Sequence, residues 1–405
     1  MYSTPLAEAL AALPTLTATE REQLLTDRTL TQLPDVFARI PDPRRRRGRR
    51  YSLSFLLTCL VAALLCNCDS TLAVEQWCVE HQPLLRQVFG PLRYLTPSGS
   101  LYRRLLPRLS VTHLEWALAG WVRTTRAPDD QEPVAVDGKT VRGARGAGMR
   151  EGPQLLSVYT HHSQETLLQV RVADKTNEIP VAQAILPLLL DHSGPGRIVT
   201  ADALHTQTAL VATIRAHGGH VVLTVKGNQP TLQADLAHLF ADPLTPVQMA
   251  QTTDRHRGRH EHRRLEVTSD LTEFLATQSP WPEIAQVARL TRTVVAAQGK
   301  TQEVVYLITT LPPALACPTC LLRLVRHHWH IENGLHRVRD VTFTEDQSRL
   351  RTGHAPQVLA TLRNLALTLL HRAGASAIAA ARRALTYHPE RAFALVLPTP
   401  LLPSS

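Results

Sequence analysis

Two aspartates in this sequence each come directly after a short apolar run, and a third acidic residue lies far downstream. Asp137 follows Val134-Ala135-Val136, Asp202 follows Ile198-Val199-Thr200-Ala201, and Glu332 stands in a histidine-rich segment. A carboxylate at the end of a buried strand is costly unless a positive charge neutralises it. Carboxylate oxygens are the ligands that Mg²⁺ and Mn²⁺ prefer in proteins. These three residues therefore predict a divalent-metal site.

The charge of the chain indicates the kind of substrate that such a site would act on. Among its 405 residues, 44 lysines and arginines stand against 34 acidic residues, and this net charge of +10 favours a polyanion such as nucleic acid. Arginines are densest between positions 44 and 50, where we expect phosphate contacts from Arg44, Arg45, Arg46, Arg47, Arg49 and Arg50. A disordered tail or a localisation signal is the alternative for this run.

Apolar and cysteine patterns predict the compartment. The apolar segment 53–66 has about the length of a buried core helix and is too short to span a bilayer. The first residues lack the pattern of a secretory signal, so we expect a cytoplasmic protein without a membrane partner. Six cysteines fit a reducing compartment. Cys317 and Cys320 have the CxxC spacing of many zinc sites. The chain has no second cysteine pair with this spacing, so we favour a loop that enters a helix over a zinc site.

Hydrophobic periodicity predicts an α/β protein in five segments. Residues 1–126 read as a helical, Arg-rich region that binds DNA, and they include a short basic helix with Arg103 and Arg104 that would contact phosphates or lie on the surface. A mixed sheet begins in 127–226, with strands at 133–137, 154–161, 167–173, 197–202 and 220–225 and helices at 180–190 and 206–217. Segment 227–312 is predicted as a β-rich insertion, 313–395 as the helical remainder of the core, and 396–405 as a disordered tail.

Six blocks, matched in one order, give the chain a family resemblance. From about residue 34 to about residue 395 it resembles insertion-sequence transposases of the DDE class, in the group that includes the H-repeat-associated proteins. The blocks that carry this resemblance are Ile40-Pro41-Asp42-Pro43 with the following arginines, Val136-Asp137-Gly138-Lys139 with Arg142-Gly143, residues 174–180, residues 200–207, Lys226-Gly227-Asn228-Gln229, and residues 328–333 with 340–343 and 345–349.

The resemblance implies both a fold and a chemistry. It implies a ribonuclease-H-like catalytic core that cuts and joins DNA strands at an element's terminal repeats and in target DNA, as a homodimer on DNA. It further implies two Mg²⁺ ions, replaceable by Mn²⁺, held by Asp137, Asp202 and Glu332. One departure stands out. Related transposases carry a Tyr-x2-Arg-x3-Glu-x6-Lys pattern around the glutamate, whereas the corresponding residues here are Val325, His328, Glu332 and Arg339.

Several assignments stay open at the level of sequence. Asp202 would otherwise cap the helix that follows it, and Asp340, Glu345 and Asp346 compete with Glu332 for the third position. Phosphate contact and plain solubility are equal alternatives for Lys139, Arg142, Lys226 and Arg339, and a histidine–arginine cluster in the insertion adds Arg257 and Arg259. We expect Trp329 to pack its helix on the sheet, and Trp281 to lie in the core rather than stack on a base.

Two functions compete with an active transposase. A decayed copy would bind DNA without cutting it, and the altered positions at Val325 and His328 keep this alternative open. A metal-dependent nuclease on the same fold would cut DNA without joining it.

Overall fold

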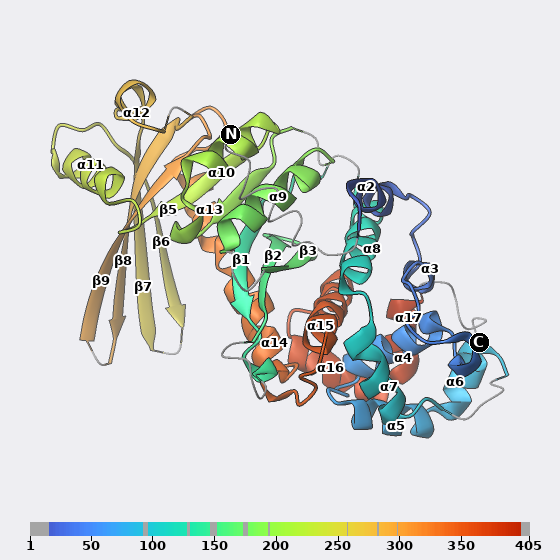
Figure 1. Ribbon diagram of the computed structural model, residues 1–405. Helices are drawn as coiled ribbons and strands as arrows, with labels where there is room; N and C mark the ends of the chain where they lie inside the picture. The colour runs from blue at the N-terminus through green and yellow to red at the C-terminus, as the bar shows by residue number, and fades with distance from the viewer. Residues whose placement is uncertain are drawn as a thin grey trace. The chain divides into compact units, whose positions relative to one another are not determined.

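The computed structural model describes residues 16–397, apart from 92–95, 128–129, 146–151, 173–176, 193–194, 257, 282 and 298 (Figure 1). The chain divides into two compact units that interleave along the sequence. The first unit contains residues 129–137 and 177–330, and the second contains residues 7–128, 138–176 and 331–405. The predicted tail lies outside the described residues from position 398 onwards. In the described part of the chain, no helix is both long and apolar enough to cross a membrane.

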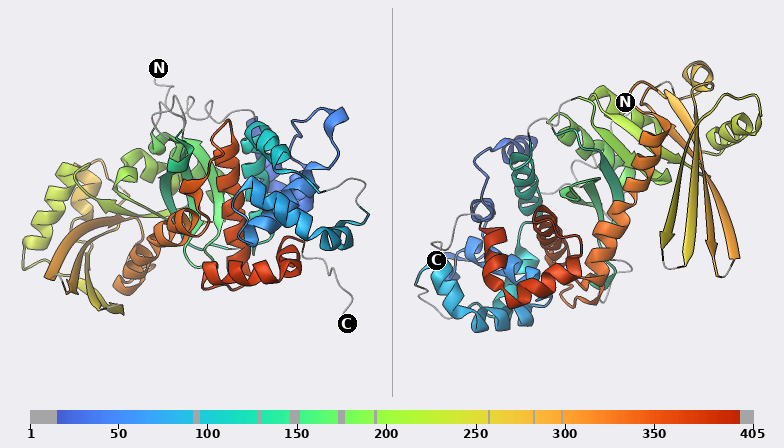
Figure 2. Two further views of the ribbon diagram at one scale, coloured as in Figure 1. Left: turned by 90° about the horizontal axis from the view of Figure 1, so that it is seen from below. Right: turned by 180° about the vertical axis from the view of Figure 1, so that it is seen from behind.

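The first unit is built on a mixed sheet. Three neighbouring strands of this sheet are parallel, namely β1 (Val134–Thr140), β4 (Ile198–Ala201) and β5 (His220–Val225). An antiparallel series continues from β5 in the order β9 (Gly299–Thr309), β8 (Gln286–Ala296), β7 (Arg259–Thr268) and β6 (Gln248–His256). The predicted insertion is therefore β-rich, as expected, but it extends the same sheet as one twisted layer (Figure 2).

Helices cover this sheet on both faces. They are α9 (Glu178–Leu190), α10 (Thr208–Ala216), α11 (Pro230–Ala241), α12 (Thr272–Gln278) and α13 (Pro318–His328), with the short 3₁₀ turn η4 (Ala203–His205) after β4. One apolar cluster joins α13 to the sheet through Leu321 and Leu322 against Leu265 and Leu307. Trp281 is buried, so its predicted place in the core is confirmed.

The second unit combines a hairpin with a helical assembly. The hairpin consists of β2 (Gln154–Thr160) and β3 (Thr166–Val172), which pair antiparallel. Its α-helices are α2 (Ala18–Thr26), α3 (Leu33–Ala38), α4 (Leu53–Leu65), α5 (Thr71–Glu80), α6 (Gln82–Phe89), α7 (Gly99–Leu105), α8 (Val111–Thr124), α14 (Arg337–Val341), α15 (Ala355–Arg372), α16 (Ile378–Tyr387) and α17 (Pro389–Val396). Shorter helical turns are η1 (Arg46–Gly48), η2 (Leu106–Arg108), η3 (Arg142–Ala144), η5 (Ile331–His336) and η6 (Glu345–Gln347).

Strand β1 runs from the first unit into the second and fixes the topology. The complete strand order is β3-β2-β1-β4-β5-β9-β8-β7-β6. An antiparallel hairpin beside β1, with parallel β4 and β5 on the other side, is the ribonuclease-H-like arrangement that we expected. Each strand and helix predicted between residues 133 and 225 is present within a few residues of its predicted position. The buried helix predicted at 53–66 is α4, in which every residue except Ser54 is buried.

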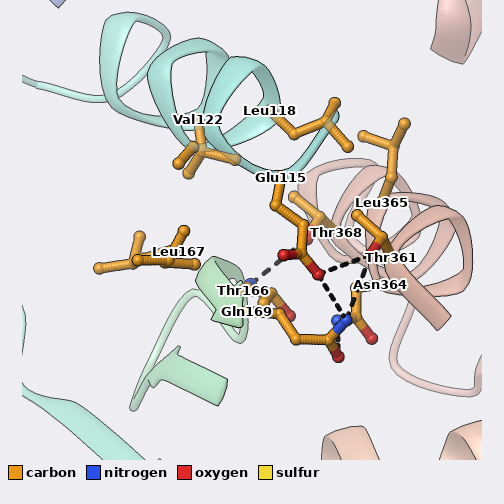
Figure 3. Close-up of a pocket in the computed structure, with 12 residues that line it drawn as sticks. Glu115, Leu118, Val122, Thr166, Leu167, Gln169, Thr361, Asn364, Leu365 and Thr368 are labelled. Atoms are coloured by element: carbon orange, nitrogen blue, oxygen red, sulfur yellow. Dashed lines mark hydrogen bonds between the residues drawn. The ribbon is translucent and has the colours of Figure 1, made fainter. Parts of the chain in front are cut away.

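A network of buried polar side chains connects α8, β3 and α15 in the second unit (Figure 3). Glu115 Oε1 accepts hydrogen bonds from Gln169 Nε2 at 3.3 Å, Gln357 Nε2 at 3.0 Å and Thr361 Oγ1 at 3.1 Å. Burial raises the pKa of Glu115 to about 8 in spite of these hydrogen bonds and of the charge of Arg339. Glu115 is therefore mostly protonated at neutral pH.

The network continues into a buried ion cluster. Gln169 Oε1 accepts a hydrogen bond from Arg339 Nη1 at 2.9 Å, and Arg339 Nη2 donates to Glu345 Oε1 at 2.8 Å. Arg363 Nη1 reaches the other oxygen of Glu345 at 3.3 Å. Burial alone would raise the pKa of Glu345, but these two guanidinium groups outweigh burial and lower it. The carboxylate is thus ionised and shared between two arginines.

A small cavity of about 30 Å³ adjoins Glu115. Thr166 Oγ1 and Asn364 Oδ1 belong to residues that line it, and both atoms are buried without a hydrogen-bond partner among the described residues. This volume holds about one or two water molecules, which these oxygens would bind. The cavity is too small for an organic ligand, so it is not a substrate site.

Replacing Glu115 with glutamine should reduce the dependence of stability on pH. The pKa of Glu115 is about 8 in the folded protein against an ordinary value of 4.5, so its contribution to stability is complete below pH 4.5 and is lost as the pH rises through 8. The difference in unfolding free energy between Glu115→Gln and the wild type should therefore rise by up to about 4 kcal/mol between pH 5 and pH 8. Urea denaturation at both pH values measures it. The exposed Glu80→Gln is the matched control. The prediction is contradicted if the unfolding free energy of Glu115→Gln, relative to the wild type, changes as little between the two pH values as that of Glu80→Gln.

Candidate active site

Asp137 lies on β1, and Asp202 directly follows the neighbouring parallel strand β4. The parallel register pairs Val134 with Val199 and ends at Val136 paired with Ala201. Continued by one residue, this register brings the two aspartates level, and neighbouring strands lie about 4.8 Å apart. Asp202 directly follows β4, as predicted. Asp137 instead lies within β1, which continues to Thr140, so the predicted end of this strand at residue 137 is wrong.

A hydrogen-bonded turn holds Asp202 in place. Its Oδ1 accepts the backbone N–H of Leu204 at 3.1 Å, so the predicted capping role is present. The segment after β5 supports the same turn. Gln229 Nε2 donates to the carbonyl of Thr206 at 2.8 Å, and Asn228 Nδ2 donates to the carbonyl of Ala203. Asn228 and Gln229 belong to a family block in the sequence, but the sequence does not indicate that they support the turn at Asp202. This support depends on the parallel packing of β4 and β5.

The histidine-rich end of α13 contacts β4. His328 Nδ1 lies 3.0 Å from Thr200 Oγ1, two residues before Asp202. His328 thus occupies the position of the arginine in the related pattern and bonds to the strand that leads to the aspartate. Trp329 is 58% exposed, so its predicted packing on the sheet is wrong. The apolar side of α13 that packs on the sheet carries leucines instead.

Glu332 lies in η5, a π-helical turn of the second unit, and its side chain is 56% exposed. Ile331 and Leu335 of the same turn are buried, whereas the glutamate is exposed. His336 Nδ1 lies 3.6 Å from Glu332 Oε2. This neighbour holds the pKa of Glu332 below its usual value, and the charges of Lys139 and Arg142 act in the same direction. Burial lowers the pKa of His336 itself. At neutral pH the glutamate is ionised beside a mostly neutral imidazole.

The three acids that competed with Glu332 already have partners in the second unit. Lys139 Nζ donates to Asp340 Oδ2 at 2.6 Å. Glu345 is shared between two arginines, and Asp346 Oδ1 accepts the backbone N–H of Gly143 at 3.3 Å. Glu332 also has a neighbour, His336, but of these four acids it has the most exposed side chain.

Arg339 is a core residue. Phosphate contact and plain solubility were the two alternatives predicted for it, and both are wrong, because its side chain is fully buried and donates to Glu345 and Gln169. The planar guanidinium of Arg339 pairs with both oxygens of the Glu345 carboxylate, a geometry that suits a buried ion pair.

The arginine run separates into two groups. Arg44 donates to both carboxylate oxygens of Asp42 and to the carbonyl of Tyr51, and Arg49 donates to the carbonyls of Arg44 and Asp42. These two arginines shape the loop around η1. The remaining members of the run are exposed, namely Arg45, Arg46, Arg47 and Arg50.

The other predicted DNA contacts also differ in exposure. Lys139 is paired with Asp340, and its side chain is only 9% exposed. Arg257 lies outside the described residues. Arg259 is exposed and lies 3.9 Å from Glu261 of the same strand. The remaining predicted contacts are exposed, namely Arg103, Arg104, Arg142 and Lys226.

The available donors fit a hard divalent cation. Asp137 is half-buried, Asp202 is exposed, and only Oδ1 of Asp202 serves the capping hydrogen bond. Together with the exposed Glu332 they offer carboxylate oxygens, which Mg²⁺ and Mn²⁺ prefer over imidazole or thiolate.

Comparisons with known proteins agree on one family. A family model described as the transposase DDE domain matches residues 128–369, and a model for a region associated with that domain matches residues 34–122. The chain is 26% identical over 352 residues to "H repeat-associated putative transposase YhhI" of Escherichia coli (strain K12), covering 84% of this chain and 90% of that protein. It is 31% identical over 251 residues to an uncharacterized protein in the dhlA 3' region of Xanthobacter autotrophicus, covering 61% of this chain and 83% of that protein.

Among solved structures, the chain matches a piggyBac transposase synaptic complex with hairpin DNA. The TM-score is 0.45 and the sequence identity is 11%, over 97% of this chain and 87% of that chain.

Truncating Gln229 should loosen the turn that presents Asp202. Gln229→Ala removes a hydrogen bond to the Thr206 carbonyl, and we expect a loss of about 1 kcal/mol of stability. Hydrogen exchange at residues 203–206 should increase more than elsewhere in the chain. The matched control is Gln233→Ala, four residues along in α11, whose side chain makes no hydrogen bond within the described part of the chain. Equal exchange at 203–206 in both variants would rule out the role of Gln229.

Proposed function

This chain belongs to the transposase DDE domain family, and we propose that it cuts DNA at the ends of an insertion sequence and joins the freed ends to target DNA. The observation that carries the proposal is the parallel register of β1 and β4, which brings Asp137 and Asp202 level at one end of the sheet. Glu332 supports it, because its side chain is exposed and the competing acids have cationic or backbone partners.

In this proposal Asp137, Asp202 and Glu332 hold two Mg²⁺ ions, with Mn²⁺ as a substitute. Such ions activate the attacking oxygen and stabilise charge on the leaving oxygen of the phosphodiester. The protein residues position the reacting strand. Asp137 is fixed by the pairing of β1, and Asp202 by the turn that Asn228 and Gln229 hold. Glu332 would supply the third carboxylate.

Exposed cations would then hold the DNA backbone on either side of the scissile bond. Lys226 follows β5 and Asp202 follows the parallel neighbour β4, so both lie at the same end of the sheet. Arg142 follows β1 and is also exposed. We propose phosphate contacts for both, and further contacts along the DNA for Arg45, Arg46, Arg47, Arg50, Arg103, Arg104 and Arg259. The protein would act on cytoplasmic DNA as a homodimer that holds two ends.

Purified protein with Mg²⁺ and a duplex from the inverted repeats that flank the gene separates the possible functions. Strand-transfer products in a target plasmid support the transposase. Cleavage without joining would indicate a nuclease, and a mobility shift without cleavage would indicate a decayed DNA-binding copy. A scrambled duplex of equal length controls for sequence-independent activity.

The aspartates should be required for cleavage and metal binding but not for DNA binding. Asp137→Asn and Asp202→Asn each remove a carboxylate from the metal site, so cleavage should fall by at least about 10³-fold. DNA affinity should stay equal or increase, because repulsion with phosphates decreases. Manganese binding, followed by water-proton relaxation, should weaken in both variants and in Glu332→Gln.

Asp242→Asn is the matched control for these changes. Asp242 is exposed and accepts the N–H of Leu244 at 2.9 Å, just as Asp202 accepts that of Leu204. This variant should cleave DNA and bind manganese like the wild type. Parallel loss of DNA binding and cleavage in Asp137→Asn and Asp202→Asn would instead mark the two aspartates as structural.

Exposed arginines of the loop around η1 should contribute to the salt dependence of DNA binding. Arg46→Ala with Arg47→Ala should weaken binding and flatten the plot of log affinity against log salt by about 0.9 for each phosphate that the variant no longer binds. Arg383→Ala with Arg391→Ala removes the same charge from exposed positions in α16 and α17 and should leave the slope unchanged. Identical slopes for the two double variants would exclude phosphate binding by Arg46 and Arg47.

A further inference from the structure

Two thiols meet at the start of α13. Cys317 is the N-cap of this helix, Pro318 is its first residue, and Cys320 lies in its first turn. The two Sγ atoms are 3.0 Å apart. A disulfide bond is about 2.05 Å long, so closing the pair requires a movement of only about 1 Å. Cys317 is exposed and Cys320 is partly buried, so a reagent reaches Cys317 first.

The surroundings give the two thiols different reactivity. Hydrogen bonds from the thiol and the backbone N–H of Cys320 favour the thiolate of Cys317 and lower its pKa. The same interaction raises the pKa of Cys320. The N-terminus of an 11-residue helix adds a partial positive charge beside Cys317. Cys317 therefore has the character of an attacking thiolate, and Cys320 has that of a resolving thiol.

The other four cysteines lack this combination. Cys59 and Cys78 are completely buried, and burial raises the pKa of Cys59. Burial likewise raises the pKa values of Cys66 and Cys68 to about 12. Thiols of this kind are largely inert towards disulfides at neutral pH. They provide an internal comparison within the same chain.

We propose that Cys317 and Cys320 form a thiol–disulfide exchange site whose substrate is a small or exposed disulfide. The Cys317 thiolate attacks one sulfur of the substrate and forms a mixed disulfide, and the other substrate sulfur leaves as a thiolate that takes up a proton. Deprotonated Cys320 then attacks Cys317 Sγ and releases the second substrate sulfur as a thiol. The two protein thiols are oxidised to one disulfide, and the substrate disulfide is reduced to two thiols.

A metal site suits this pair less well. A structural zinc ion takes four ligands, usually cysteine and histidine. Within the described part of the chain, no group of three potential metal ligands includes Cys317 or Cys320. Oxidation would instead fix the first turn of α13 covalently. The last turn of the same helix carries His328, which contacts Thr200 of β4.

Oxidised glutathione is the probe that tests the proposal on the intact protein, with peptide mass spectrometry as the readout. The wild type should lose two hydrogens and yield a peptide linked between Cys317 and Cys320, and reduced glutathione should reverse this. Cys320→Ser should accumulate a stable glutathione adduct on Cys317. Cys317→Ser should react at Cys320 about tenfold more slowly than Cys317 does in Cys320→Ser. Cys68→Ser is the matched control and should behave like the wild type.

Three results would overturn the proposal. The first is a lasting glutathione adduct on Cys317 of the wild type, which would show that Cys320 does not displace it. The second is Cys317 reacting no faster than the buried cysteines. The third is stoichiometric zinc that blocks oxidation of the pair. Circular dichroism of each variant establishes that it is folded, and none of these results depends on DNA cleavage.

Discussion

The parallel hydrogen bonding between β1 and β4 is the constraint on which the candidate site depends. It pairs Val136 with Ala201, and an aspartate directly follows each of these two residues. Because strand side chains alternate between the two faces of a sheet, a slip of one residue would direct these carboxylates to opposite sides. The paired residues from Val134 to Val136 and from Val199 to Ala201 are all buried, so core packing on both faces of the sheet holds this register. The apolar core thus sets the spacing of the acids.

Helix α13 connects several features of the first unit. It begins at the thiol pair, packs its leucines on the sheet, and ends with His328 against β4. Near this end Arg326 also pairs with Asp254 of β6 at 2.9 Å. A single helix therefore touches both the outermost strand and the strand that leads to Asp202, which is possible because residues 248–309 extend the same sheet.

Sequence patterns predicted the elements of the core well, because apolar alternation and helical periodicity are local signals. They also singled out Asp137, Asp202 and Glu332, whose shared metal binding stays a prediction. What they missed depends on packing between distant segments. Nothing in the sequence around Arg339 indicates that Glu345 and Gln169 enclose it, and charge alone did not distinguish Arg44, which shapes a loop, from the exposed Arg46. The prediction that Trp329 packs on the sheet was wrong because the leucines of α13 already cover that surface.

Because Arg339 and Arg363 share Glu345, substitutions at these three positions are not independent of one another. Losing Glu345 leaves two buried arginines without their shared carboxylate, whereas replacing all three residues with apolar ones is far less harmful. Substitution of Glu345 alone therefore lowers the amount of folded protein before it alters any chemistry. Diverging copies of the gene should keep Glu345 wherever both arginines remain, and a copy that has lost only this glutamate has begun to decay.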